Sequence, residues 1–265
     1  MATAVTHRLL EFLAVAATLQ LGLWAYAWRA GNWAWVDVGW SASFALGVGA
    51  WCARAPDVAP LPLVALVVTW SLRLALHLAT DRVIGRPEEG RYVELRRRWG
   101  RGGDGARAFL IFYLAQAALA AVLAVALVVP FAAAPVPGAR AALRWLGLAV
   151  GAAGLAVEVI ADAQLARWKR DPAHRGQVCD VGLWRYSRHP NYFGEWCVWL
   201  GYATFALAYP WGAIALVGPV IILASIWKVT GIPATEAQAL RSRGDAYRRY
   251  QATTSAFVPW PRRRR

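Results

Sequence analysis

The residues best suited to chemistry lie close together, in the stretch GLWRYSRHPNYFGEWCVWLG at positions 182–201. Pro190 suits the first position of a helix, where its missing N–H is not needed, so Asn191 and Glu195 share one helix face. Glu195 would lie about one turn inside the apolar segment that follows, where an unpaired carboxylate is costly. The polar side chains available to a ligand are Arg185, Arg188, His189, Asn191, Tyr192 and Glu195. So many donors beside one acid predict a pocket for a phosphate or carboxylate group. The alternative is that the two arginines only orient the chain in a membrane and that one of them pairs with Glu195.

Two acids, Glu158 and Asp162, lie at the end of an earlier apolar segment, and Arg167 and Lys169 follow them. Because two like charges on one helix face repel each other, these carboxylates are expected to accept hydrogen bonds from a ribose or an amide, or to pair with the cations. The simpler alternative is a pair of acids that reaches the membrane surface from a helix end.

A third group consists of Arg73, His77 and Asp81, which recur at intervals of four residues and therefore share a helix face. Arg73 is the cation deepest in an apolar segment, and Asp37 in the preceding apolar segment is its natural counter-charge. A cation in this place could stabilise negative charge that develops on a substrate. It could equally form an ion pair that joins two helices and takes no part in chemistry.

The end of the chain contributes an amphipathic segment at residues 234–250, in which Glu236, Tyr247 and Tyr250 lie among basic residues. Such a pattern predicts a helix at the membrane surface. We expect these three side chains to complete the same pocket.

The elements that must position these groups are membrane helices. Of the 265 residues 58% are hydrophobic and 17% charged, against about 25% charged in a soluble domain, and the mean hydropathy is +0.37. A bilayer core needs about 20 apolar residues in a helix. We therefore predict an all-α integral membrane protein of one domain, residues 1–265, with no metal site, because the cysteines lack metal-ligand spacing. The seven predicted transmembrane helices cover residues 8–29, 34–53, 60–80, 108–131, 141–162, 191–208 and 211–230.

The distribution of positive charge predicts the orientation. If the N-terminus lies outside, 24 of the 29 Lys and Arg residues lie on the cytoplasmic side, 4 lie outside, and Arg73 lies within the third helix. Positive residues favour the cytoplasmic side, so we expect a cytoplasmic C-terminus. Orientation also explains the net charge of +14, which in a soluble protein would suggest nucleic acid. The expected partners are the lipid bilayer and a lipid-soluble small molecule.

The motifs resemble those of the membrane steroid 5α-reductase superfamily, and of its bacterial branch in particular. The resemblance rests on RYSRHPNYFGE followed by WLGYA, on the acids and Arg167 upstream, and on Tyr247, Tyr250 and Phe257-Val-Pro downstream. It implies seven transmembrane helices and an NADPH pocket that faces the cytoplasm. The residues that it places near the cofactor are Asp162, Lys169, Asn191, Glu195 and Tyr250. Arg188 and His189 belong to a form of the motif that sterol reductases share with isoprenylcysteine carboxyl methyltransferases.

The resemblance implies an NADPH-dependent reductase of a conjugated carbon–carbon double bond in a lipid-soluble, steroid-like or isoprenoid-like substrate. Steroid 5α-reductases polarise a 3-oxo group with a carboxylate on the second helix and a tyrosine on the third. The third predicted helix has no tyrosine here, so we expect Arg73 or His77, positioned by Asp37, to take that role.

Two alternatives stay open. One is an S-adenosylmethionine-dependent methyltransferase of a lipid or prenyl group, with Arg188, His189 and Glu236 around the methionine moiety. The other is a lipid-binding membrane protein without catalytic activity.

Overall fold

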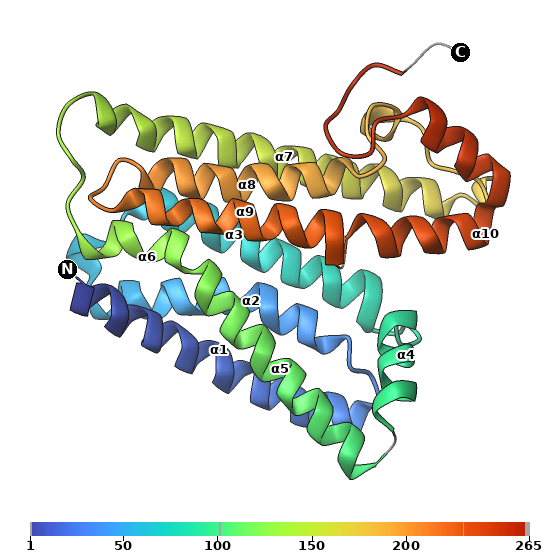
Figure 1. The fold of residues 1–265 in the computed structure, drawn as a ribbon, viewed down its shortest axis with the longest axis horizontal. Helices are drawn as coiled ribbons and strands as arrows, with labels where there is room; N and C mark the ends of the chain where they lie inside the picture. The colour runs from blue at the N-terminus through green and yellow to red at the C-terminus, as the bar shows by residue number, and fades with distance from the viewer. Residues whose placement is uncertain (1, 101, 230, 263–265) are drawn as a thin grey trace. The chain divides into compact units, whose positions relative to one another are not determined.

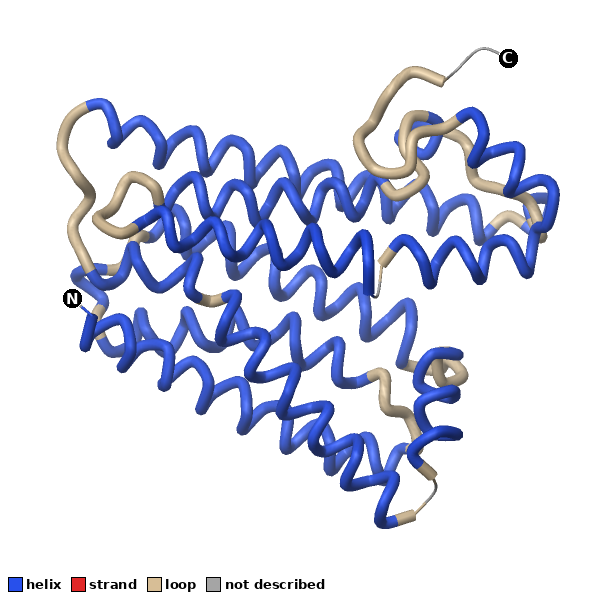
Figure 2. Tube along the Cα trace, viewed as in Figure 1, coloured by secondary structure: helices blue, strands red, loops and turns tan. Residues whose placement is uncertain are grey.

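The computed structural model describes residues 2–100, 102–229 and 231–262. Apart from one isolated β-bridge between Ser187 and Ser255, the regular structure of these residues is helical (Figures 1 and 2). Predicted as one domain, the chain folds into two compact units. Unit 1 comprises Met1–Ala141 and Ala206–Ala215, and unit 2 comprises Ala142–Phe205 and Leu216–Arg265.

Unit 1 consists of helices joined by short connections. They are α1 (Ala2–Ala30), α2 (Trp35–Arg54), α3 (Leu61–Leu78, continued by a π-helical turn, Ala79–Val83), α4 (Gly90–Trp99), α5 (Gly103–Leu123) and α6 (Val125–Ala132). Helix α1 packs on α2 and α5, and α2 packs on α3.

An aromatic cluster joins the helices of unit 1. The rings of Trp33 and Phe109 stack with their centroids 4.2 Å apart, and the hydroxyl of Tyr113 donates to the Trp33 carbonyl at 2.8 Å. Burial of such large rings is the main source of stability in a helix packing of this kind.

Unit 2 contains α7 (Ala142–Arg170), α8 (Pro190–Ala206), α9 (Val217–Ala224, continued by a π-helical turn, Ser225–Val229) and α10 (Ile232–Thr253). Helix α10 is bent at Gly244, whose φ of 51° is one that residues with a Cβ rarely adopt.

Glycines let α7 and α8 approach until their backbones touch. A Cβ added at Gly154 would lie 2.7 Å from the carbonyl oxygen of Gly194, and one added at Gly201 would lie 2.6 Å from the carbonyl oxygen of Gly147. Close contacts between small residues are typical of helix pairs in membranes. The contact leaves no space for a side chain and therefore fixes the register of α7 against α8.

Five helices of the described residues are long and apolar enough to cross a membrane: α1, Leu61–Val83, α5, α7 and Gly212–Thr253. The last of these would be about 63 Å long at 1.5 Å per residue, twice the thickness of a bilayer core of about 30 Å. Only its first part is apolar, and the charged α10 lies beyond the predicted span 211–230.

A helix also lies over each of the other predicted spans. Asp37 and several small residues lower the hydrophobicity of α2, and α8 has 17 residues, fewer than the about 20 that a bilayer core needs. That these two helices cross the membrane stays a prediction.

Candidate functional site

The loop that precedes α8 is held by α7. The indole N–H of Trp184 donates to the Ala161 carbonyl at 2.9 Å, and the backbone N–H of Leu183 donates to the side-chain oxygen of Gln164 at 2.8 Å. Gly182 has a φ of +57° and lies against the Gln164 side chain, where a Cβ would overlap it. The loop therefore enters α8 in one fixed conformation, with Ser187, Arg188 and His189 at its end.

Glu236 of α10 lies between Arg188 and His189. The Arg188 Nε donates to the Glu236 carboxylate at 2.7 Å, and His189 Nε2 lies 3.2 Å from the same oxygen. The other carboxylate oxygen accepts from the Gln251 side chain at 2.6 Å. The side chains of Arg188, His189 and Glu236 are 12%, 3% and 13% exposed. The sequence predicted all three as site residues but did not predict that they bind one another.

The partners of Glu236 keep it ionised. Burial raises the pKa of Glu236, but hydrogen bonds from His189, Arg188 and Gln251 outweigh burial and lower this pKa to about 2. Its nearest phenol, Tyr247, has a raised pKa because it is buried and because Glu236 is negatively charged. Glu236 is therefore ionised at neutral pH and forms an ion pair with Arg188.

The same arginine fastens the terminal segment, which we define as residues 254–262. Arg188 Nη1 donates to the carbonyls of Gln251 and Thr254 at 3.1 and 2.6 Å, and its backbone N–H donates to the Ser255 carbonyl at 2.8 Å. Ser187 Oγ donates to the Phe257 carbonyl at 2.7 Å. The terminal segment thus closes over the start of α8.

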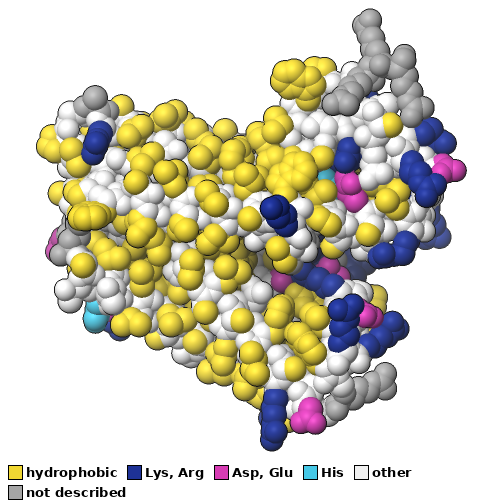
Figure 3. Space-filling view, viewed as in Figure 1, with side chains coloured by type: hydrophobic (Ala, Val, Ile, Leu, Met, Phe, Trp, Pro, Cys, Tyr) yellow, Lys and Arg dark blue, Asp and Glu magenta, His cyan; other side chains and the backbone are white. Residues whose placement is uncertain are grey.

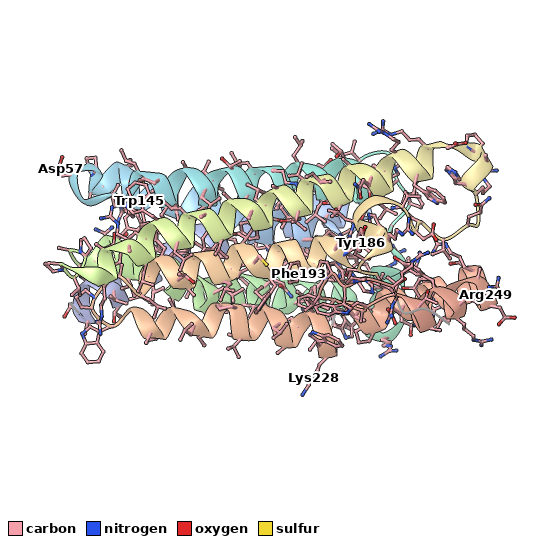
Figure 4. The ribbon with its side chains drawn as sticks, turned by 90° about the horizontal axis from the view of Figure 1, so that it is seen from above. Asp57, Trp145, Tyr186, Phe193, Lys228 and Arg249 are labelled. Atoms are coloured by element: carbon pink, nitrogen blue, oxygen red, sulfur yellow. The ribbon has the colours of Figure 1, made fainter. Side chains whose placement is uncertain are left out.

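The side chain of Phe257 anchors the terminal segment among aromatic rings of the helices. The Phe257 ring lies 5.5 Å from Phe193, 6.0 Å from Trp196 and 6.0 Å from Trp227, measured between centroids. Figure 4 labels Phe193 on α8 and Tyr186 on the loop before it. The Tyr250 hydroxyl, which was predicted near a cofactor, donates to the Trp184 carbonyl instead.

A polar pair joins α7 to α8 beside the clamp, the name that we give to Arg188, His189 and Glu236 together with the terminal segment that they hold. The Asn191 side-chain amide donates to the Asp162 carboxylate at 3.1 Å. One turn deeper on α7, Glu158 is only 3% exposed, and its backbone lies against Gly194, where a Cβ would be 2.7 Å from the Glu158 nitrogen. The structure thus brings the two predicted acids and Asn191 to one side of the α7–α8 contact. Glu195 lies one turn further along α8 and is partly buried.

Tyr192 points to the neighbouring helix. Its ring stacks on His189 with centroids 5.2 Å apart, and its hydroxyl lies 3.1 Å from that of Thr235. The predicted cations Arg167, Lys169 and Arg185 are exposed around the same end of α7 and α8. Unit 2 therefore carries carboxylates and an amide inside, and cations outside.

In unit 1 the structure corrects one prediction. Asp37 does not act as the counter-charge of Arg73: its carboxylate binds Arg91 and accepts a hydrogen bond from the Tyr92 hydroxyl at 2.9 Å. Tyr92 lies on α4, is 1% exposed, and packs in the aromatic cluster of unit 1. Asp37 therefore fastens α4 to the first turn of α2, and it is not available to position Arg73.

Arg73 and His77 lie one turn apart on α3, as predicted, and both are partly buried. Among the residues that the structure describes, no group of three His, Cys, Asp or Glu side chains could hold a metal ion.

Chemically, the arrangement in unit 2 suits a ligand with hydroxyl or amide groups next to phosphates. Carboxylates accept from hydroxyls, and guanidinium groups bind phosphate through charge-assisted hydrogen bonds. A family model, described as a protein of unknown function, matches residues 23–254. No curated protein and no solved structure matches the chain.

Proposed function

The chain belongs to the DUF1295 family, and from its site we propose that it is an NADPH-dependent membrane reductase. It would reduce a conjugated carbon–carbon double bond in a lipid-soluble, steroid-like or isoprenoid-like substrate. This proposal includes membership of the steroid 5α-reductase superfamily, which the motif around Arg188 and Asn191 supports. It also includes seven transmembrane helices, with α10 on the cytoplasmic face of a bacterial inner membrane.

The observation that carries the proposal is the α7–α8 polar pair with its surrounding charges. NADPH has ribose hydroxyls and a carboxamide, and it carries several negative charges on its phosphates. Asp162, hydrogen-bonded to Asn191, and the buried Glu158 supply acceptors for hydroxyls and for an amide. Arg167 and Arg185 are exposed and supply cations for phosphates.

The residues of the chain would act as follows. When bound, NADPH would supply a hydride to the β-carbon of the double bond, and the resulting enolate would take a proton from water at its α-carbon. Asp162, Asn191 and Glu195 hold the cofactor in place and fix its orientation. Arg73 or His77 donates to the carbonyl oxygen of the substrate and stabilises the negative charge that develops there.

The methyltransferase alternative is less well supported by the same contacts. It needs Arg188, His189 and Glu236 to contact the methionine moiety, so several contacts that these side chains make with one another and with the terminal segment would have to be exchanged. S-adenosylmethionine also has no phosphate for the exposed cations. In a lipid-binding protein without activity the polar pair would only join α7 to α8, and neither cofactor would bind.

Ligand-dependent thermal stability tests the proposal on the purified full-length protein. NADPH is expected to raise the melting temperature, whereas S-adenosylmethionine is not. Asn191→Ala is expected to weaken NADPH about tenfold to a hundredfold, as for the loss of a hydrogen bond to a charged group worth about 1.5–3 kcal/mol.

Thr204→Ala is the matched control, because Thr204 lies on the same helix and its hydroxyl donates to the Leu200 carbonyl of that helix at 2.8 Å. Stabilisation by S-adenosylmethionine alone would favour the methyltransferase, and stabilisation by neither would refute a cofactor site.

A further inference from the structure

Unit 2 has a pocket that is separate from the proposed cofactor site. Of the residues predicted for that site, the pocket is lined by Tyr250 alone. It has a volume of about 580 Å³ and lies between the end of α7, the loop that follows it, the last turns of α10 and the terminal segment. Its lining includes Trp168, Asp180, Arg249, Tyr250, Thr253 and Arg262. Volumes of 300–1,000 Å³ are typical of small-molecule sites.

The charges at this pocket leave an excess of one cation. Arg262 donates to Asp180 at 2.8 Å, and its guanidinium lies 6.0 Å above the Tyr250 ring. Asp180 is therefore already neutralised, and Arg262 is held in one place by a carboxylate and an aromatic face. Arg249 is exposed, and within the described residues its guanidinium has no ion pair or hydrogen bond. Figure 4 labels Arg249 near the end of unit 2 remote from Trp145.

Aromatic rings give the pocket rigid walls. The Trp168 indole stacks on the His174 ring with centroids 3.5 Å apart and 4° between the planes. Tyr250 is fixed by its hydrogen bond to the Trp184 carbonyl, and Trp184 is fixed to α7. These contacts hold one side of the pocket and Arg262 in place before a ligand binds, which lowers the entropic cost of binding.

We propose that this pocket binds a phosphate group, with Arg249 as its main ligand and Arg262 as the second. Two guanidinium groups, one already oriented, form the donor arrangement that binds phosphate through charge-assisted hydrogen bonds. The space-filling view shows Lys and Arg side chains gathered around α10 (Figure 3). Because these side chains are positively charged, they attract anions to this end of unit 2. The phosphate could belong to a free nucleotide or to the headgroup of an anionic lipid, and it requires no reductase activity.

Calorimetric titration of the full-length protein in neutral detergent with AMP tests the nucleotide source, with adenosine as the control that lacks the phosphate. Arg249→Gln is expected to weaken AMP at least tenfold, because it removes one charge-assisted contact. Arg248→Gln is the matched control: Arg248 is adjacent, 72% exposed, and paired with Asp245 at 2.8 Å, and it does not line the pocket. It should change the affinity less than twofold.

The lipid source is tested by native mass spectrometry of protein from mixed micelles that contain phosphatidylglycerol or phosphatidylcholine. If the phosphate belongs to a lipid, phosphatidylglycerol is retained by the parent and by Arg248→Gln but lost from Arg249→Gln. A loss of AMP affinity or of bound phosphatidylglycerol in Arg249→Gln, without a loss in Arg248→Gln, supports the proposal and identifies the source of the phosphate. Equal losses in both variants would mean only diffuse attraction, and binding of neither probe would mean no site; both results overturn the proposal.

Discussion

Glu236→Gln is expected to release the terminal segment, because Glu236 holds the arginine that fastens it. The glutamine keeps the size of the side chain and can still accept a hydrogen bond, but it has no charge. Arg188 would lose its charged partner at 2.7 Å while still facing the carbonyls of Gln251 and Thr254. The change is therefore a local loosening rather than global unfolding.

The pKa of Glu236 gives the magnitude. Folding lowers this pKa from 4.5 to about 2, and each pKa unit corresponds to about 1.36 kcal/mol. The ionised carboxylate therefore stabilises the clamp by about 3 kcal/mol. Because the folded pKa is lower than the unfolded one, this contribution is complete above about pH 4.5 and is lost as the pH falls toward 2. At pH 3 about 2 kcal/mol is already lost.

Hydrogen exchange followed by mass spectrometry measures the effect directly. The backbone N–H of Trp260 donates to the Tyr186 carbonyl at 2.9 Å and should exchange slowly in the parent. In Glu236→Gln, exchange of the peptide that covers residues 254–262 should accelerate up to about a hundredfold at pH 7. The difference between parent and variant should shrink as the pH is lowered from 5 to 3.

Arg185→Gln is the control, since Arg185 is exposed and lies on the same loop. It should leave exchange of the terminal segment unchanged. If Glu236→Gln also left that exchange unchanged at pH 7, the carboxylate would not fasten the segment, and the reasoning from the ion pair would be wrong.

Three further predictions concern other parts of the chain. Gly154→Leu should separate α7 from α8 and lower the unfolding free energy, measured by thermal unfolding, by about 1–3 kcal/mol or more. Gly49→Leu should have little effect, because nothing lies within 4 Å of a Cβ added at Gly49. Equal losses of stability in the two variants would contradict the close contact. Arg73→Met should reduce turnover about 10²–10³-fold with NADPH affinity within about twofold, and unchanged turnover would exclude the proposed electrophile. Alkaline phosphatase fused after Arg265 should be inactive, because the enzyme is active only outside the cytoplasm, and an active fusion would refute the orientation.

The approximate positions of the long apolar helices could be predicted, because each one corresponds to a long run of apolar residues in the sequence. Residues 60–80 match α3 closely, and residues 141–162 match the start of α7, which continues to Arg170 beyond the apolar run. The same reasoning could not show where an apolar run is interrupted: the predicted fourth span is broken between α5 and α6 at Ala124. Five helices of the described residues are long and apolar enough to span, which is consistent with a membrane protein, and the number of crossings stays a prediction.

The sequence predicted candidate site residues, whose role stays a prediction, but it did not predict the contacts between them. Asn191 and Asp162 were both expected near a ligand, and the glycine contact brings them together. The Asp37 partner was predicted wrongly, because Arg91 and Tyr92 reach it only through the folding of α4, 54 and 55 residues away. The clamp around Arg188 was missed because two of its partners are backbone carbonyls, which have no signature in the sequence.

The backbone contact between α7 and α8 has a consequence for motion. Side chains between helices can change rotamer and so allow one helix to slide on another. At Gly154, Gly194 and Gly201 backbone atoms of the two helices meet, and the side-chain atoms nearest to this contact are the Cβ atoms of Cys197 and Glu158, which do not move when a rotamer changes. The two helices should therefore move as one rigid rod. Opening of unit 2 for a ligand must then come from α10 and from the terminal segment, while the rod, with the loop that α7 holds, acts as the fixed frame against which they move.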